Sequence, residues 1–159
     1  MSFDLRFERL IAAPPERVFA AFTAPEGQRE FYGKDAPGWI VESDCDLRVG
    51  GIWSIAFGPS RAELYHHRHE FRAIEIPRRI LMTTTETRLD GSSFSVSTEF
   101  AFEPHAGGTR MTMVQTGFPT LELREEHTIG VPHGFDRLER WLDHDSRVAT
   151  NARWTERGA

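Results

Sequence analysis

Most of the chain alternates between apolar and polar residues, and only its last third changes to the spacing of a helix. The alternation runs from Trp39 to Phe118 and predicts β-strands, because successive side chains of a strand point to opposite faces of a sheet. A sheet with one apolar face needs a cover, and only the segment from Pro132 onward is long enough to supply it. The order predicts an α+β, helix-grip fold in which a curved antiparallel sheet wraps around a long C-terminal helix.

The expected elements follow one another without a linker or repeat, so residues 1–159 are expected to form a single domain. A first strand at 3–10 precedes two short helices, with Pro14 and Pro15 at the start of the first helix and Glu26 to Phe31 in the second. Asp90-Gly91 predicts a hairpin turn. About six further strands are expected, for six to seven in all, at 39–44, 52–57, 62–76, 79–89, 93–104 and 110–118.

The final helix is expected to begin at Pro132, because proline suits the first turn of a helix. Asp136 and Glu139 would then lie near its positive N-terminal end. The apolar residues that recur at helical spacing are Phe135, Leu138, Trp141, Leu142 and Val148 or Ala149.

Composition argues against several classes of function. The formal net charge is −5 and no basic stripe is present, so we expect no nucleic-acid partner. Cys45 is the only cysteine, which excludes an intramolecular disulfide. The N-terminal MSFDLRFERL lacks the features of a signal peptide, and no stretch is apolar enough to span a membrane. We therefore expect a cytoplasmic protein, and a homodimer stays open.

The segment YHHRHEF, from Tyr65 to Phe71, contains three of the seven histidines. On a strand, His67 and His69 share one face and His66 points away. The charged residues between them belong in water, so the inward row is expected to be Tyr65, His67, His69, Phe71 and Ala73. Burial of an imidazole without a hydrogen-bond partner is costly. Candidate partners are Tyr32, Tyr65, Thr84, Glu86, Thr98 and Gln115.

The same alternation assigns faces to the other strands. The residues expected to face the helix are Trp53, Ile55 and Phe57; Ile80, Met82, Thr84 and Glu86; Phe94, Val96, Thr98, Phe100 and Phe102; and Met111, Met113 and Gln115.

Five segments together cover nearly the whole chain: "APPERVFAAFT" (13–23), "DLRVGGIWSI" (46–55), "IPRRILMTT" (76–84), "GGTRMTMVQTGF" (107–118) and "HGFDRLERWL" (133–142). In these segments and their order, the chain resembles the START-like (SRPBCC) helix-grip superfamily, which includes polyketide cyclase and Bet v-type relatives. Within it, the chain looks most like the branch named for the activator of the heat-shock protein 90 ATPase. Phe31-Tyr32 stands where that family often has Trp, and Gly134-Phe135 where it often has Gly-Trp. The resemblance implies a hydrophobic cavity between the sheet and the long helix, without implying one reaction.

We expect this cavity to bind a small hydrophobic molecule, because such pockets are mainly apolar with a few placed polar groups. One alternative is an enzyme of the cyclase, hydrolase or dehydratase type with His69 as acid or base, paired with Glu86. Another is a chaperone-interacting, ATPase-activator-like domain, which is less favoured because no second module accompanies it. A purely structural role of the two histidines is also open. The expected lining is Phe31, Trp53, Ile55, His67, His69, Phe71, Met113, Phe118 and Phe135.

The His-x-His spacing of His67 and His69 could direct two imidazoles at one metal ion, but a third ligand would be required. Glu70 lies on the opposite face and Glu75 lies far along the strand. His127 could approach only from the helix side. We therefore expect no metal and no other cofactor.

Overall fold

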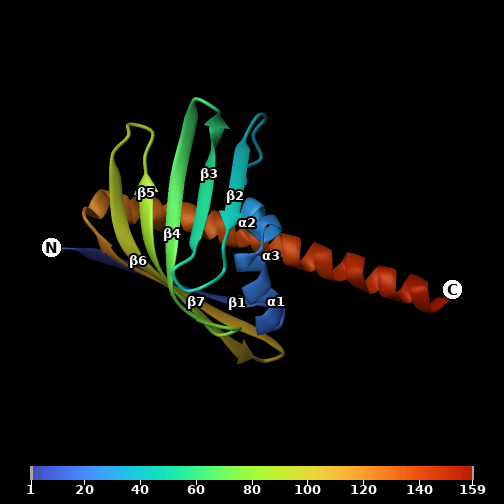
Figure 1. Cartoon of the computed structure of the whole chain (residues 1–159). Coiled ribbons are helices and arrows are strands. Elements are labelled where there is room, and N and C mark those ends of the chain that lie inside the picture. The colour runs from blue at the N-terminus through green and yellow to red at the C-terminus, as the bar shows by residue number, and fades with distance from the viewer. Residues whose placement is uncertain (1, 159) are drawn as a thin grey trace.

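One antiparallel sheet curves around a long helix in the computed structural model, which describes the backbone of residues 2–158 and the side chains of residues 2–144 (Figure 1). Within that range seven strands lie in the order β1-β7-β6-β5-β4-β3-β2. The predicted fold is therefore confirmed. The elements are β1 (Phe3–Ile11), α1 (Pro15–Thr23), α2 (Pro25–Phe31), β2 (Ile40–Cys45), β3 (Ile52–Ser60), β4 (Glu63–Glu75), β5 (Arg79–Thr87), β6 (Ser93–His105), β7 (Gly108–Phe118) and α3 (Leu121–Gly158).

The strands alternate between buried and exposed residues as the sequence predicts. In β5, Ile80, Met82, Thr84 and Glu86 are all buried, and the residues between them are less so. β6 and β7 follow the same pattern, with Thr98 and Gln115 among the buried polar residues. The inner face is thus mostly apolar but carries a row of polar side chains, and this row forms the site described below.

A β-bulge in β4 changes the face of the residues that follow Phe71. The pairing with β5 shifts between Phe71, which lies opposite Met82, and Ala73, which lies opposite Leu81. Ile74 then packs against the hydrophobic core. The prediction that Ala73 points inward is wrong, because a bulge inserts one residue and reverses the alternation beyond it.

α3 crosses the concave face of the sheet and begins at Leu121, so the prediction that it begins at Pro132 is wrong (Figure 1). The Leu123 N–H donates to the Thr120 hydroxyl oxygen at 3.2 Å, which caps the helix at its actual start. Pro132 lies inside the helix, at a cost of about 3 kcal/mol in an isolated helix. Contacts of α3 with the sheet offset this cost. The predicted positions Val148 and Ala149 lie outside the residues whose side chains are described.

An arginine of the edge strand β1 fixes the middle of α3. Arg9 Nη1 donates to Asp136 Oδ1 at 2.7 Å and to Glu139 Oε2 at 2.8 Å, and Arg9 Nη2 donates to the Pro132 carbonyl at 3.3 Å. Asp136 and Glu139 were expected near the helix N-terminus. Because α3 begins earlier, they instead lie within the helix and pair with Arg9.

Aromatic side chains from four elements fill the space between α1, α2, α3 and the sheet. Phe22 of α1 lies at their centre, with ring centroids 4.8 Å from Phe100, 5.6 Å from Phe102, 6.0 Å from Phe31 and 6.2 Å from Phe135. This cluster holds the end of α2 against α3 and the inner face of the sheet. In the part of the chain that the structure describes, no helix combines the length and the apolar character needed to cross a membrane.

Candidate functional site

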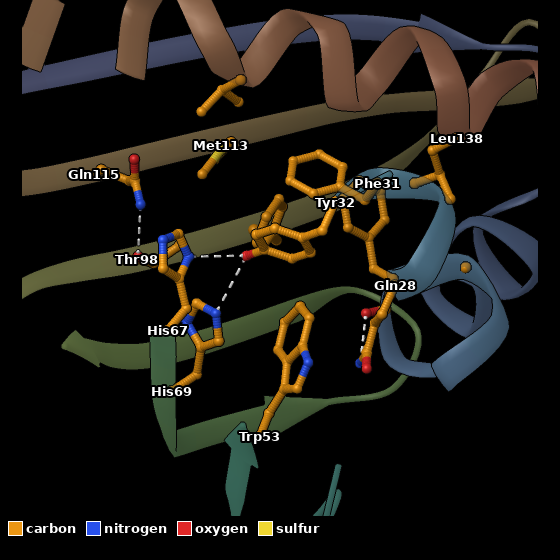
Figure 2. Close-up of a pocket in the computed structure, with 14 residues that line it drawn as sticks. Gln28, Phe31, Tyr32, Trp53, His67, His69, Thr98, Met113, Gln115 and Leu138 are labelled. Atoms are coloured by element: carbon orange, nitrogen blue, oxygen red, sulfur yellow. Dashed lines mark hydrogen bonds between the residues drawn. The ribbon is translucent and has the colours of Figure 1, made fainter. Parts of the chain in front are cut away.

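The end of α2 places a tyrosine hydroxyl between two imidazole rings of the sheet. Tyr32 directly follows α2, and its hydroxyl oxygen lies 3.3 Å from His67 Nδ1 and 3.5 Å from His69 Nε2 (Figure 2). His67 and His69 are alternate residues of β4 and both point inward, whereas His66 is exposed, as predicted. The inward-facing histidines of β4 and the tyrosine that follows α2 thus form one polar cluster.

A buried carboxylate lies on the other side of His67. Glu86 of β5 is 6% exposed and stands opposite His67 in the strand pairing. Its Oε1 accepts hydrogen bonds from His67 Nε2 at 3.1 Å and from His127 Nε2 of α3 at 2.8 Å. His127 Nδ1 lies 2.8 Å from the Leu123 carbonyl oxygen. Since both partners of His127 are acceptors, its ring donates from both nitrogens, as an imidazolium does.

The charges of this cluster follow from its burial and its contacts. Burial alone would raise the pKa of Glu86, but His67 and His127 outweigh it and hold that pKa well below its usual range. Burial alone would lower the pKa of His127, but Glu86 outweighs it and raises that pKa. Burial raises the pKa of the Tyr32 phenol, and Glu86 raises it further. An ionised pair, Glu86 and His127, therefore stands beside a neutral phenol.

If His67 donates only from Nε2, the contacts around Tyr32 follow one direction of hydrogen-bond donation. His67 Nε2 donates to the Glu86 carboxylate, which leaves His67 Nδ1 to accept from the Tyr32 hydroxyl, the shorter of that hydroxyl's two contacts. The Tyr32 oxygen then accepts from His69 Nε2, so His69 Nδ1 is an acceptor. Burial lowers the pKa of His69 to about 3, which keeps this ring neutral.

The same direction continues along the inner face into β6 and β7. His69 Nδ1 accepts from the Thr84 hydroxyl at 2.8 Å, and the Thr84 oxygen accepts from the Thr98 hydroxyl at 2.8 Å. The Thr98 oxygen accepts from Gln115 Nε2 at 3.1 Å. With this direction every hydroxyl hydrogen of the chain has an acceptor. One polar chain therefore runs from Gln115 to Glu86.

The amide oxygen of Gln115 lies at the end of this chain. Gln115 is 3% exposed, and among the described side chains its Oε1 has no hydrogen-bond partner. A buried acceptor that is left unsatisfied costs about 1–3 kcal/mol, so native proteins rarely keep one. The oxygen is enclosed by neighbouring atoms of the protein.

A small inner pocket of about 40 Å³ is lined in part by Gln115 (Figure 2). A void of this size has room for a water molecule or one small chemical group. Its walls are mostly apolar and come from α2, the sheet and α3. They are formed by Phe22, Gly27, Gln28, Phe31, Tyr32, Trp53, His67, His69, Thr98, Phe100, Met113, Gln115, Val131 and Leu138.

A larger cleft of about 640 Å³ opens next to the inner pocket. The two spaces share Phe31, Tyr32, His67 and Val131 as wall residues. Aromatic rings make up the sides of the cleft, while His67, Glu86 and His127 supply polar groups. Its other wall residues are Gly33, Lys34, Trp39, Phe57, Tyr65, Thr87, Arg88, Glu126, Gly130, His133, Gly134 and Arg137.

Comparison with known families places this geometry in context. The model of the family described as "Activator of Hsp90 ATPase homolog 1-like protein" matches residues 12–143. The chain belongs to this family. The match includes α1, α2, all of the inner-face residues named above and His127. No curated protein matches the chain.

Solved bacterial structures share the fold of this Hsp90-activator-homologue-like chain. An uncharacterized protein from Rhizobium leguminosarum is 23% identical with a TM-score of 0.78, and the match covers 91% of this chain and 96% of that one. A protein from Chromobacterium violaceum is 23% identical with a TM-score of 0.74, covering 87% and 96%. One from Mesorhizobium loti is 23% identical with a TM-score of 0.71, covering 89% and 98%. At these identities the likeness concerns the fold alone.

The structure separates the predicted lining residues of this family member into two groups. Phe31, Trp53, His67, His69 and Met113 line the inner pocket. The others pack elsewhere: Ile55 and Phe71 are buried in the main core, Phe135 contacts Phe7, Phe22 and Phe31, and Phe118 joins a separate cluster with Leu5 and Val96. Phe118 and Phe135 therefore support the walls from behind.

Two polar contacts differ from those considered from the sequence. Glu86 pairs with His67 rather than His69, because the strand register places His69 opposite Thr84. His127 joins the site although its spacing gave no reason to expect it, since the prediction began the helix at Pro132. The signal that could have revealed it is Thr120, a helix-capping residue type before Leu121.

A glycine of α3 allows the close approach of α2. A Cβ atom added to Gly134 would lie 2.8–2.9 Å from three ring carbons of Phe31, closer than real contacts allow. We expect Gly134→Ala to push Phe31 toward the cleft and to lower the free energy of unfolding by about 1–3 kcal/mol.

Gly130→Ala in the same helix is the matched control for Gly134→Ala. At Gly130 no described atom lies within 4 Å of an added Cβ, so this variant should gain about 0.5–1 kcal/mol from helix propensity. Urea denaturation followed by tryptophan fluorescence measures both. Equal effects of the two substitutions would contradict the close packing of Gly134 on Phe31.

Among the described residues, no group of three or more His, Cys, Asp or Glu is arranged to hold a metal ion. The imidazoles and the carboxylate of the site instead hydrogen-bond to one another. The polar side chains at the cleft can form hydrogen bonds and transfer protons beside aromatic surface.

Proposed function

We propose that this protein binds a small, mostly apolar molecule whose body lies in the cleft and whose leading end enters the inner pocket. The observation that carries the proposal is the junction of the two spaces at Phe31, Tyr32, His67 and Val131. A cleft of about 640 Å³ has the size of small-molecule sites. Aromatic walls with a few fixed polar groups are also typical of such sites.

The two ends of the proposed site differ in character. The cleft is open to solvent and can admit a ring system against Tyr32, Trp39 and Phe57. These three rings pack together, with centroids 4.9 Å apart for Tyr32 and Phe57 and 6.4 Å for Trp39 and Phe57. The inner pocket is narrow and buried. A bound molecule would therefore enter with its small end first.

Blocking the junction tests the proposal. The neutral dye N-phenyl-1-naphthylamine should bind the wild-type protein with a fluorescence increase that saturates at one dye per chain. Val131→Trp fills the shared wall and should weaken this binding at least tenfold. Ile129→Trp is the control, because Ile129 lies two residues away and is 70% exposed. Circular dichroism checks that both variants fold. The proposal fails if the wild type binds no dye, or if both variants bind it as the wild type does.

The second candidate function is proton transfer in the same cleft. It is favoured by His67, which lines the cleft between the Tyr32 hydroxyl and the Glu86 carboxylate, the arrangement of a base with an orienting partner. His69 is less suited to this role, because its pKa is lowered to about 3 and its ring contacts Thr84. An enzyme would lose turnover in His67→Gln while still binding the dye. A binding protein would show no turnover to lose.

A further inference from the structure

The charged side chains in the wall of the cleft do not balance one another. The whole chain has a formal net charge of −5, yet the wall contains three Lys and Arg side chains and only two carboxylates. Both carboxylates already have partners. Glu126 pairs with Arg88 at 2.8 Å, and Glu86 pairs with two histidines of the site. The cations that remain are Lys34 and Arg137, and within residues 2–144 neither forms an ion pair with a carboxylate.

Arg137 of α3 is anchored at the end of α2. Its Nε donates to the Glu30 carbonyl and its Nη2 donates to the Phe31 carbonyl, both at 3.1 Å. A guanidinium has five N–H groups, so these two bonds leave three of them for other acceptors. The side chain is half-buried and belongs to the wall of the cleft. Arg137 is therefore a cation held in place by neutral partners.

The surroundings of Arg137 compensate its charge only in part. Burial, followed by the neighbouring charge of Arg140, lowers the pKa of the Arg137 guanidinium, although Asp35, Asp136 and Glu30 act in the opposite direction. None of these three carboxylates is a wall residue of the cleft. An anion that binds in the cleft would therefore add a compensating charge that the protein does not supply there.

Lys34 is held against the aromatic part of the same wall. Its Nζ lies 5.3 Å from the centroid of the Trp39 ring, in cation–π contact. Trp39 is itself fixed, because its Nε1 donates to the Tyr32 carbonyl at 3.0 Å. Lys34 is exposed, and it follows Phe31, whose carbonyl binds Arg137, by three residues. Both cations are thus positioned by the end of α2.

We propose that the ligand of this protein carries an anionic group, such as a carboxylate, at its trailing end, and that Lys34 and Arg137 bind this group. This inference rests on the proposed function and adds the chemical class of the ligand. Both cations line the cleft and neither lines the inner pocket, so the apolar end of the molecule enters the inner pocket while its anion stays outside it. Hydrogen bonds between a carboxylate and a guanidinium or ammonium group are among the strong ones in proteins.

An anion fits this cleft better than a cation does. Aromatic rings can bind a cationic ligand, but Lys34 already occupies a position over the Trp39 ring. A second cation would meet the charges of Lys34 and Arg137. The two carboxylates that could attract it, Glu86 and Glu126, are engaged by partners within the protein.

Three naphthalene probes with one ring system and different charges test the inference. In titration calorimetry at low ionic strength, 2-naphthylacetate should bind the wild-type protein about tenfold more tightly than the neutral 2-naphthylacetamide. The cationic 2-(2-naphthyl)ethylammonium should bind more weakly than the amide. Because Lys34 is exposed, about 1 M salt should remove part of the preference for the acetate.

Removal of each cation should reduce the preference for the anionic probe. Lys34→Gln and Arg137→Gln should each weaken the binding of 2-naphthylacetate several-fold and leave that of 2-naphthylacetamide almost unchanged. Lys34→Gln alters an exposed side chain, so this variant is expected to fold. Arg29→Gln is the matched control. It removes the same charge from an exposed residue of α2 that is not in the wall of the cleft, and it should keep the wild-type ratio.

The outcomes separate the inference from the proposed function. If the wild type binds the amide or the cationic probe as tightly as the acetate, the anion preference is overturned and ligand binding stays in place. The same holds if the preference survives both Lys34→Gln and Arg137→Gln, or if Arg29→Gln lowers it as much as they do. If no probe binds the wild type, or if Val131→Trp leaves the binding of all three unchanged, both proposals fail.

Discussion

His69→Gln is expected to make the free energy of unfolding depend less on pH below pH 6.5. His69 is unprotonated in the folded state down to about pH 3, because burial lowers its pKa, whereas in the unfolded chain it protonates near pH 6.5. Between these two values the unfolded state binds one more proton than the folded state. The free energy of unfolding therefore falls by about 1.4 kcal/mol for each pH unit of acidification.

The measurement is urea denaturation at several pH values between 6.5 and 5. In this range Glu86 does not yet contribute to the pH dependence of the free energy of unfolding. His69→Gln should remove the one-proton slope, whatever its effect on stability at neutral pH. His66→Gln alters an exposed histidine of the same strand and should leave the slope unchanged. An unaltered slope in His69→Gln would show that His69 is protonated in the folded protein.

The alkaline side of the profile depends on a different histidine. The pKa of His127 is raised above 6.5 by Glu86, so its contribution is complete below pH 6.5 and is lost as the pH rises through the folded value. The pKa of Glu86 is lowered, so its contribution is complete above about pH 4.5 and is lost on further acidification. Maximum stability is therefore expected near pH 6.5.

Glu86→Ala is expected to lower the free energy of unfolding by about 3–5 kcal/mol at pH 6.5. The substitution leaves the His127 imidazolium and the His67 N–H inside the protein without their acceptor, and loss of one partner of a buried ion pair has effects of this size. Thermal or urea denaturation measures the loss. Glu126→Ala is the surface control. It removes the exposed pair with Arg88, at 2.8 Å, and should cost less than about 1 kcal/mol.

A double-mutant cycle isolates the contact between β5 and α3. His127→Ala combined with Glu86→Ala should cost less than the sum of the two single changes, because each single change leaves one buried group without its partner. Additive effects would mean that Glu86 and His127 do not interact in solution.

The fold could be predicted because its pattern is local. Alternation in residues such as Met111, Met113 and Gln115 reports which face of a strand is buried, and this depends only on neighbouring residues. The prediction failed where tertiary structure overrides local preference. Ala73 turned outward because of a bulge, and Pro132 lies within α3 because contacts elsewhere stabilise the helix across it.

The site could be predicted only in part for the same reason. The inward direction of His67 and His69 follows from alternation within one strand. Their partners depend on the register between β4 and β5, which places Glu86 beside His67, and on the position of His127 on a helix that crosses the sheet. Neither relation is encoded within a short window of sequence. The free acceptor on Gln115 emerges only once all of these partners are placed.

Pro132 gives α3 a point of weakness at the edge of the cleft. Without an N–H, it cannot donate to the carbonyl of Thr128, so the backbone ladder of the helix is interrupted there. The first eleven residues of α3, 121–131, thus form a short arm. His127 to Glu86 and Glu126 to Arg88 attach it to β5 and the residue after it, and Arg124 to the Asp4 carbonyl attaches it to β1. Substitutions at these contacts would widen or narrow the entrance of the cleft while the sheet stays intact.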